Sequence, residues 1–179
     1  MLNKISKILN SIDPAHVDAL IGSLVQAKED GKKILIVGVG RSGLVGRAFA
    51  MRLMHLGFNV YIVGETITPA FREGDLVIII SGSGTSSIPV AVVNMSKELK
   101  TEVIALTSYP ESPVGKMANK IVEISGRRVV LGGEEYYARQ LTGIHTPLDP
   151  MGSIFENACM IFLDSVITEL TNRLKINRT

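Results

Sequence analysis

The chain twice repeats one order of segments, an apolar run, a glycine-containing loop and a helical stretch, and this order restricts the fold more than any other feature. The first apolar run, residues 34–37, leads into the loop 38–43, and residues 76–80 lead into the loop 81–87. Continuous apolar runs of this length are typical of parallel strands that are covered on both faces. The five expected strands are residues 34–37, 60–63, 76–80, 103–106 and 121–124. Because strands that alternate with helices build a covered parallel sheet, we predict an α/β fold, a three-layer αβα sandwich around a five-stranded parallel sheet.

Helices are expected on both sides of these strands and at both ends of the chain. Residues 1–31 read as an N-terminal helical segment in which Asp13 caps a helix that begins with Pro14 and stops at Gly31. The other expected helices are residues 44–56, 89–100, a short helix opened by Ser112 and Pro113, and residues 151–175. The polar, irregular residues 126–149 are interpreted as a lid or a subunit contact. We expect residues 1–179 to form a single domain.

Composition and charge exclude several classes of protein. Lys and Arg number 19 and Asp and Glu 17, and the resulting net charge of +2 gives no reason to expect a nucleic-acid or membrane partner. A single cysteine, Cys159, excludes an internal disulfide framework and a cysteine-rich metal site. The sequence contains neither a signal peptide nor an apolar run of membrane-spanning length, so we expect a cytoplasmic protein.

The first loop, residues 38–43, has the pattern G-x-G-x-x-G between a strand and a helix. Its glycines would let the backbone approach an anion, and the helix N-terminus would offer free N–H groups. Three interpretations stay open: a dinucleotide site with Glu65 on a ribose, a site for another anion, or a tight turn without a ligand. Arg41 and Arg47 could neutralise a phosphate or orient a sugar hydroxyl, the alternative being solvated surface side chains.

The second loop, residues 81–87, contains four serines and one threonine directly after the most apolar strand. Its hydroxyls, backbone N–H groups and helix N-terminus would form a neutral cradle for a dianionic phosphate, the alternative being a flexible polar loop. Ligands bind at the carboxyl ends of strands in open α/β sheets, so two such loops together favour a phosphate site. The absence of a Walker pattern argues against a nucleoside triphosphate.

Five blocks in order carry a resemblance to a known family: residues 38–43, 50–57, 63–66, 81–84 and 150–156. Over nearly its whole length the chain resembles the sugar isomerase (SIS) domain family, and within it the 6-phospho-3-hexuloisomerases. The resemblance implies interconversion of D-arabino-hex-3-ulose 6-phosphate and fructose 6-phosphate in the ribulose monophosphate route. It also implies a homotetramer and a functional link to 3-hexulose-6-phosphate synthase.

The paired loops and the resemblance together give the candidate substrate-binding and phosphate-binding residues. They are Gly40, Arg41, Ser42, Arg47, Glu65, Thr66, Ser81, Gly82, Ser83, Ser86 and Ser87. The chain departs from the family pattern after Gly84, where the family often has a charged residue followed by threonine. Ser86 keeps a hydroxyl at this point, whereas the contribution of Thr85 stays open.

The implied reaction moves a carbonyl between C3 and C2 and needs a base that transfers a proton through a cis-enediol. Hydrogen-bond donors could stabilise the enediolate oxygens, so we expect no metal ion and no other cofactor. Glu156 matches the family's catalytic glutamate. The segment from Ser153 to Glu156 also has the pattern of a capping box, which the sequence alone favours, while the resemblance favours catalysis.

His55 is the second catalytic candidate. It follows Leu44, Ala48 and Met51 at helical spacing, and this apolar stripe predicts a buried core histidine. His55 lies 13 residues after Ser42 on one expected helix, about 20 Å away at 1.5 Å per residue. If His55 is catalytic, it must therefore act in the site of a neighbouring subunit.

Two other functions stay open beside this isomerase. One is a different aldose–ketose phosphosugar isomerase of the same family, acting on sedoheptulose 7-phosphate or arabinose 5-phosphate. The other is a phosphosugar-binding protein without catalysis. The candidate base Glu156 favours an enzyme with a phosphorylated ketohexose as its substrate, because binding alone needs no base.

Overall fold

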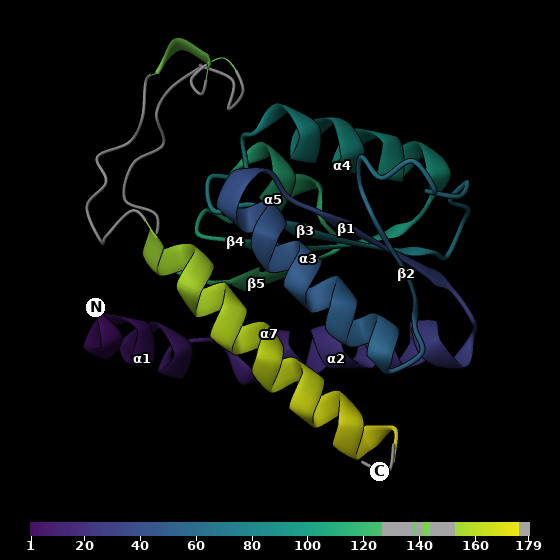
Figure 1. The fold of residues 1–179 in the computed structure, drawn as a ribbon, viewed down its shortest axis with the longest axis horizontal. Coiled ribbons are helices and arrows are strands. Elements are labelled where there is room, and N and C mark those ends of the chain that lie inside the picture. Colours follow the sequence, from purple (N-terminus) through teal and green to yellow (C-terminus); the bar gives the residue numbers. More distant parts are fainter. Residues whose placement is uncertain (127–137, 139–140, 144–152, 176–179) are drawn as a thin grey trace.

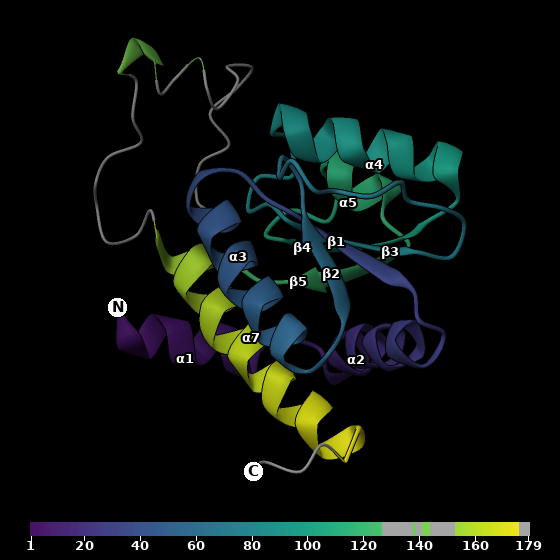
Figure 2. The same cartoon turned by 45° about the vertical axis from the view of Figure 1, so that its right-hand side comes forward.

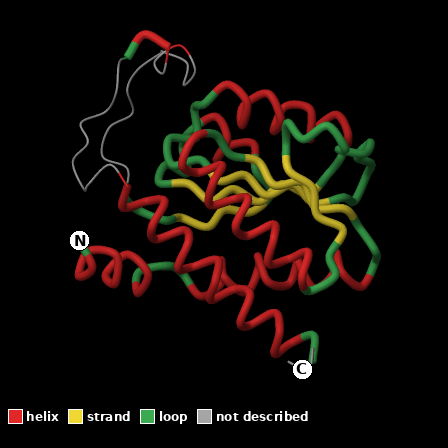
Figure 3. The backbone as a smooth tube through the Cα atoms, in the orientation of Figure 1, coloured by secondary structure: helices red, strands yellow, loops and turns green. Residues whose placement is uncertain are grey.

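A parallel sheet of five strands forms the centre of the computed structural model, which describes residues 1–126, 138, 141–143 and 153–175. The strand order across the sheet is β2-β1-β3-β4-β5, and every neighbouring pair is parallel. Figure 3 shows the strands at the centre with the helices around them. The strands are β1 (Lys33–Val37), β2 (Asn59–Ile62), β3 (Leu76–Ile80), β4 (Glu102–Thr107) and β5 (Lys120–Glu123). The predicted five-stranded parallel sheet is confirmed, with strand bounds shifted by at most two residues.

Helices cover both faces of this sheet. They are α1 (Leu2–Asn10), α2 (Pro14–Glu29), α3 (Gly40–His55), α4 (Ser87–Leu99), α5 (Pro113–Met117) and α7 (Ile154–Arg173). Figures 1 and 2 show α4 and α5 on one face, and α2, α3 and α7 on the other with α1 beside them. The predicted αβα sandwich is therefore confirmed.

The side chains of the central strand β3 explain why its sequence is apolar throughout. Successive side chains of a strand point to opposite faces of the sheet. Leu76, Ile78 and Ile80 pack into the core beneath α2, α3 and α7. Val77 and Ile79 pack into the second core, beneath α4 and α5. Both faces of β3 are buried, so no polar position is tolerated within it.

The helix boundaries at the N-terminal end follow the predicted capping. The Asp13 carboxylate accepts a hydrogen bond from the backbone N–H of Ala15 at 2.8 Å, and Pro14 is the first residue of α2. Gly31, just beyond the end of this helix, has a φ of +62°, which glycine adopts without steric cost. The segment 1–31 therefore holds two helices.

Two further expectations concern the C-terminal part. The interpretation of residues 126–149 as a lid or subunit contact falls almost wholly outside the described residues. The last helix begins at Ile154 in the structure, and residues 151 and 152, where the sequence predicted its start, are also outside them. In the part of the chain that is described, no helix is long and apolar enough to cross a membrane.

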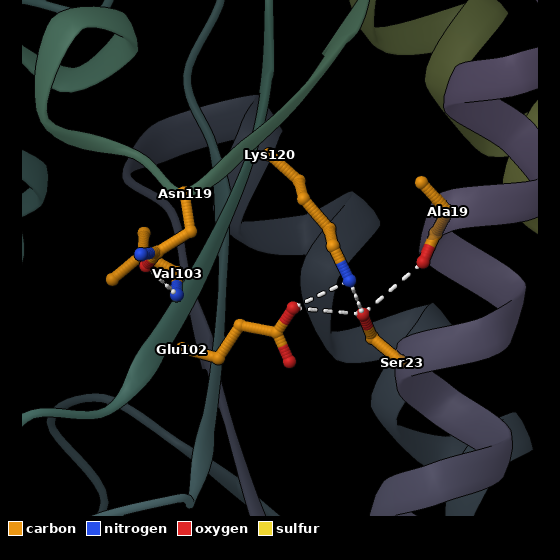
Figure 4. A network of polar contacts seen from close by, with 6 residues as sticks. All are labelled: Ala19, Ser23, Glu102, Val103, Asn119 and Lys120. Atoms are coloured by element: carbon orange, nitrogen blue, oxygen red, sulfur yellow. Dashed lines mark hydrogen bonds and ion pairs between the residues drawn. The ribbon is translucent and has the colours of Figure 1, made fainter.

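At the amino ends of the strands, charged side chains link helix α2 to the sheet. Lys120, the first residue of β5, donates to Ser23 Oγ on α2 at 2.7 Å and pairs with Glu102 Oε1, at the start of β4, also at 2.7 Å (Figure 4). Ser23 Oγ lies 3.0 Å from the same carboxylate oxygen and 3.1 Å from the carbonyl oxygen of Ala19. This network joins α2 to two neighbouring strands.

A second charged contact lies at the same end of the sheet, where Asp75 precedes β3. Its carboxylate accepts hydrogen bonds from the backbone N–H groups of Lys33 (2.9 Å) and Arg72 (2.8 Å) and pairs with Lys33 Nζ at 2.9 Å. Burial acts to raise the pKa of Asp75, but the contacts with Lys33 and Arg72 outweigh it and hold the pKa below its ordinary value. The ionised carboxylate therefore stabilises the junction between β1 and β3.

Candidate active site

The two loops that the sequence singles out lie at the carboxyl ends of the adjacent central strands β1 and β3. From these strands the chain proceeds outward in opposite directions, to β2 on one side and to β4 and β5 on the other. Ligands of open α/β sheets bind at such a switch point. The loop after β1 leads into α3 on one face, and the loop after β3 leads into α4 on the other (Figure 2). Two helix N-termini, each a favourable end for an anion, thus flank one edge of the sheet.

The first loop is shorter than predicted, because α3 begins at Gly40 and not near Leu44. Gly40 has a φ of +56°, a conformation that favours glycine. A Cβ atom on Gly38 would lie 2.9 Å from the backbone of Ser42, and one on Gly43 would lie 2.9 Å from the carbonyl oxygen of Gly38. The tight turn itself therefore requires glycine at all three positions of the motif. The turn brings Arg41, which is exposed, and Ser42, which is buried, into the first turn of α3.

Arg47 and Glu65, two candidate substrate-binding residues, form an ion pair with each other. They come from different segments of the chain. Arg47 comes from the second turn of α3, and Glu65 from the turn that follows β2. Both side chains are about half exposed. The Glu65 carboxylate accepts from Arg47 through Oε1, which leaves its second oxygen able to accept from a sugar hydroxyl. Thr66, the next residue, is exposed in the same turn.

Hydrogen bonds within the second loop hold its serines in a defined turn. Ser81 is buried, and its Oγ accepts from the backbone N–H of Gly84 at 3.2 Å. Ser83 Oγ accepts from the Thr85 hydroxyl at 3.2 Å and lies 3.4 Å from the Thr85 backbone nitrogen. Thr85, whose role the sequence left open, therefore orients the Ser83 hydroxyl.

The remaining candidates of this loop lie at the start of α4. Ser86 is its N-cap residue, and its side chain makes no capping hydrogen bond to the helix. Ser87 is the first helical residue and is exposed, whereas Gly82 is buried beside Ser81. The Ser86 hydroxyl is thus not used to cap its own helix.

Glu156 lies in the first turn of α7, and its side chain is buried, with 4% of the residue exposed. Gly126, three residues beyond β5, fixes the place of this turn, because a Cβ atom on it would lie 2.8 Å from the backbone nitrogen of Phe155. The start of α7 is therefore packed against the carboxyl end of the sheet. Figures 1 and 2 show α3 and α7 side by side, with their N-terminal ends at this same edge.

The predicted capping box lacks its serine half at this helix start. Ser153 occupies the N-cap position but makes no side-chain capping hydrogen bond. The capping role of Glu156, which is the other half of the box, stays a prediction beside the catalytic one. Cys159, one turn further along α7, is buried as predicted, and both burial and the negative charge of Glu156 raise the pKa of its thiol.

His55 is exposed at the far end of α3, and the prediction of a core histidine is wrong. Helix α3 has two apolar stripes side by side. The stripe of Val45, Phe49 and Leu53 is buried. The stripe predicted to be buried instead faces outward, with Leu44 65% and Met51 50% exposed. Periodicity alone could not choose between two stripes that are both apolar.

Sequence reasoning missed the segment that follows β4. The backbone N–H of Ser108 donates to the carbonyl oxygen of Gly82 at 3.2 Å, and that of Val114 donates to the carbonyl oxygen of Gly84 at 3.1 Å. This segment therefore supports the second loop from behind. The only feature of this segment that the sequence indicated was the helix start at Ser112. The Ser112 side chain caps α5 by accepting from Gly115 N–H at 3.2 Å.

The described part of the chain contains no group of three or more His, Cys, Asp or Glu side chains that could hold a metal ion. The groups gathered at this edge are hydroxyls, backbone N–H groups, two arginines and two carboxylates. Such a set can bind a phosphate ester and, through a buried carboxylate, accept a proton.

Comparison with known proteins agrees with this architecture. The model of the SIS domain matches residues 29–143, and the chain belongs to the SIS domain family. A 3-hexulose-6-phosphate isomerase of Bacillus subtilis is 38% identical, with 97% of this chain and 86% of that protein aligned. A 3-hexulose-6-phosphate isomerase of Methanocaldococcus jannaschii is 39% identical over 91% of this chain and 78% of that protein.

A solved structure agrees in fold and in sequence. It is a crystal structure of a Methanococcus jannaschii protein with an inferred function of 3-hexulose-6-phosphate isomerase. It superposes with a TM-score of 0.75 at 35% identity, covering 98% of this chain and 92% of that chain.

Proposed function

We propose that this chain is a phosphosugar isomerase that interconverts D-arabino-hex-3-ulose 6-phosphate and fructose 6-phosphate. The observation that carries the proposal is a buried carboxylate, Glu156, at the same edge of the sheet as two loops suited to a phosphate. Binding a phosphosugar needs no such base, whereas isomerisation does. The names of the relatives in Bacillus subtilis and Methanocaldococcus jannaschii support this choice of substrate.

In this proposal the phosphate lies between the N-termini of α3 and α4. Ser42 and Arg41 act from the first loop, and Ser83, Ser86 and Ser87 from the second, together with the backbone N–H groups near Gly40 and Gly82. Hydroxyls and helix ends supply most of the donors, in keeping with a chain whose net charge is only +2. Ser81 acts through the turn that its Oγ holds.

We also propose that the sugar hydroxyls of the substrate contact Arg47, Glu65 and Thr66. The ion pair fixes the Arg47 guanidinium, so that its remaining N–H groups can donate to sugar hydroxyls. Glu65 retains acceptor capacity for a hydroxyl donor, because a carboxylate has two oxygens.

Glu156 is the proposed base. It removes the proton from C2 of the 3-ulose, and the electrons of the C–H bond form the C2–C3 double bond of a cis-enediolate while the C3 carbonyl oxygen takes up the negative charge. The proton returns to C3, and the hydroxyl proton on O2 is transferred to O3, so that the C2 carbonyl forms as the C3 hydroxyl is restored. Hydrogen-bond donors at the loops stabilise the enediolate oxygens. No atom is gained or lost, so the proposed cycle needs no co-substrate.

His55 takes part, in this proposal, from a second copy of the chain. It lies about 20 Å along α3 from Ser42, on a helix whose Leu44, Met51 and Met54 side chains are exposed. Two α3 helices packed antiparallel through these apolar side chains would bring His55 of one copy to the start of α3 in the other. The apolar stripe thus supports a homo-oligomer, which the family resemblance suggests is a tetramer.

The physiological setting is likewise a proposal. We expect a cytoplasmic enzyme of the ribulose monophosphate route, functionally linked to 3-hexulose-6-phosphate synthase, which would supply or consume its 3-ulose. The route serves formaldehyde fixation or pentose phosphate supply, according to its direction.

The deciding experiment incubates the purified protein with fructose 6-phosphate and detects the 3-ulose through the coupled synthase. The expected result is cofactor-free isomerisation with proton exchange at the sugar carbons. Glu156→Gln should abolish the exchange and keep phosphosugar binding, whereas Glu98→Gln, which removes an exposed carboxylate from α4, should retain both. Binding of fructose 6-phosphate without any exchange in the unaltered protein would instead favour a phosphosugar-binding protein.

A further inference from the structure

The second loop is hydrogen-bonded to the chain that runs from β4 into α5, which presents three groups to it. Ser81 N–H donates to the carbonyl oxygen of Leu106 at 3.0 Å, where the loop leaves β3. The carbonyl oxygens of Gly82 and Gly84 accept from the N–H groups of Ser108 and Val114, at 3.2 and 3.1 Å. Two carbonyl oxygens of the loop are therefore turned toward β4 and α5.

The direction of these two carbonyl oxygens decides whether the loop can bind an anion. Successive backbone N–H groups form an anion-binding concavity only when the carbonyl oxygens between them point elsewhere. A carbonyl oxygen turned toward a phosphate would repel it. The segment after β4 thus governs the sign of the electrostatic potential that the second loop presents.

Gly84 and Ser112 form the tightest contact between the loop and this segment. Gly84 has a φ of +63°, and a Cβ atom on it would lie 1.9 Å from Ser112 Oγ and 2.5 Å from Ser112 Cβ. Ser112 is buried, and it is fixed in place because its Oγ accepts from Gly115 N–H at 3.2 Å and its own N–H donates to the Tyr109 carbonyl oxygen at 3.0 Å. The Ser112 side chain therefore fits against residue 84 only if that residue is glycine.

We propose that Ser112 is a positioning residue for the phosphate loop: packed against Gly84, it holds the loop with its carbonyl oxygens turned away from the bound phosphate. The proposal rests on the proposed phosphate site. It assigns to Ser112 no contact with the substrate. Its effect is on the affinity for phosphate esters, through the conformation of residues 81–86.

The test uses Gly84→Ala, Ser112→Gly and the double variant, with Gly31→Ala as the matched control. Gly31 has nearly the same φ, +62°, but a Cβ atom on it meets nothing within 4 Å, at the other end of the sheet. Both alanine variants therefore carry the same backbone strain, and only Gly84→Ala also forces the loop off Ser112. In the double variant the Ser112 side chain is gone, and the next atom to meet the new Cβ is Thr107 Oγ1 at 3.4 Å.

Affinities for fructose 6-phosphate and for inorganic phosphate are measured by calorimetry, with KM, kcat and thermal unfolding alongside. Loss of one hydrogen bond to a charged phosphate weakens binding by roughly tenfold to 100-fold, so Gly84→Ala should weaken both affinities and raise KM by about that factor. The change in kcat should be smaller than that in KM. Ser112→Gly alone should also weaken both affinities, because the loop loses the side chain against which it packs. The double variant should recover most of the lost affinity, because the methyl group added at residue 84 fills the space that the Ser112 side chain leaves. Gly31→Ala should lower thermal stability with KM unchanged.

Additive effects in the double variant, or a Gly84→Ala protein that binds as well as Gly31→Ala, would overturn the positioning role. These results stand apart from the proposed reaction. A wild-type protein that binds fructose 6-phosphate without isomerising it contradicts the reaction but leaves the affinity comparison valid. A wild-type protein that binds neither fructose 6-phosphate nor inorganic phosphate overturns the positioning role together with the phosphate site.

Discussion

The two ends of the central sheet are built from different chemistry. At the amino ends of the strands, charged side chains meet partners from other elements, as in Lys33 with Asp75 at 2.9 Å and Lys120 with Glu102 at 2.7 Å. At the carboxyl ends of β1 and β3, the loops consist mainly of serines and of glycines, of which Gly40 and Gly84 have positive φ. The amino end joins elements to one another, whereas the carboxyl end keeps donors available at the edge of the sheet.

This difference separates two kinds of substitution. Changes at the amino end should lower the free energy of unfolding and leave substrate affinity intact. Changes of polar side chains at the carboxyl end should alter binding or catalysis with little change in stability. The five experiments below test the separation, from the largest expected effect to the smallest.

The largest effect is expected at the carboxyl end, from Glu156→Gln. Removal of a general base typically costs a factor of about 10²–10⁴, so kcat should fall by that amount, while the isosteric amide keeps the helix start packed. The coupled isomerase assay measures kcat, and urea unfolding measures stability. A Glu156→Gln enzyme with wild-type kcat would show that the base lies elsewhere.

The second test concerns sites shared between copies. Mixing inactive His55→Ala and Glu156→Gln chains under exchange conditions should restore about a quarter of wild-type activity if each site joins two chains. The control mixes Glu156→Gln with a chain carrying both substitutions, which should restore nothing. An active His55→Ala protein, or no recovery from the first mixture, contradicts the shared site.

At the amino end, Asp75→Asn should have the largest effect on stability. Three contacts to a buried carboxylate are weakened or lost, and hydrogen bonds to charged groups contribute about 1.5–3 kcal/mol each before compensation. We expect a loss of about 2–4 kcal/mol in the free energy of unfolding, measured by urea titration. KM for fructose 6-phosphate should stay unchanged, and a raised KM would mean that the two ends are coupled.

The pH dependence of stability offers a finer test of the same residue. The pKa of Asp75 is lower in the folded protein than its ordinary value of 3.8. Its contribution is therefore fully present above that value and is lost as the pH falls through the folded pKa. The wild-type protein should lose more stability than Asp75→Asn between pH 5 and the acid limit of folding, as measured by urea midpoints at each pH. Parallel pH profiles would contradict this assignment.

The smallest effect is expected from Ser23→Ala, which removes the hydroxyl shared by Lys120 and Glu102 in Figure 4. The ion pair itself remains, so the loss should be about 0.5–1.5 kcal/mol. Ser165→Ala is the matched control, because that hydroxyl is exposed and bonds only within its own helix, to Ile161. Equal losses in both variants would show that the network does not join α2 to the sheet.

The fold was predictable because each central strand is apolar throughout and is followed by a helix. The convergence of the two loops was predictable as well, since neighbouring parallel strands end at one edge. The exposure of His55 was not, because α3 has two apolar stripes and only the packing of Val45, Phe49 and Leu53 against the core selects the buried one. The start of α3 at Gly40 also depends on a contact, that of Gly38 with Ser42.

The contact of the segment after β4 with the second loop could not be predicted from the sequence, because it too depends on tertiary packing. Ser112 precedes Pro113 in a common helix-start pattern, and nothing in that pattern points to Gly84, 28 residues earlier. The contact exists because β3 and β4 are neighbours in the sheet. The contact could therefore be predicted only from the strand order, which the sequence does not give.

The position of Glu156 on α7, the last helix described, has a consequence for synthesis. The ribosome makes both loops and all five strands before it makes this helix. Under the proposed roles, the residues for the phosphate are therefore made before the residue that would move the proton. In that proposal binding precedes chemistry along the polypeptide itself, and α7 adds the base to a domain that already holds the groups for binding a sugar phosphate.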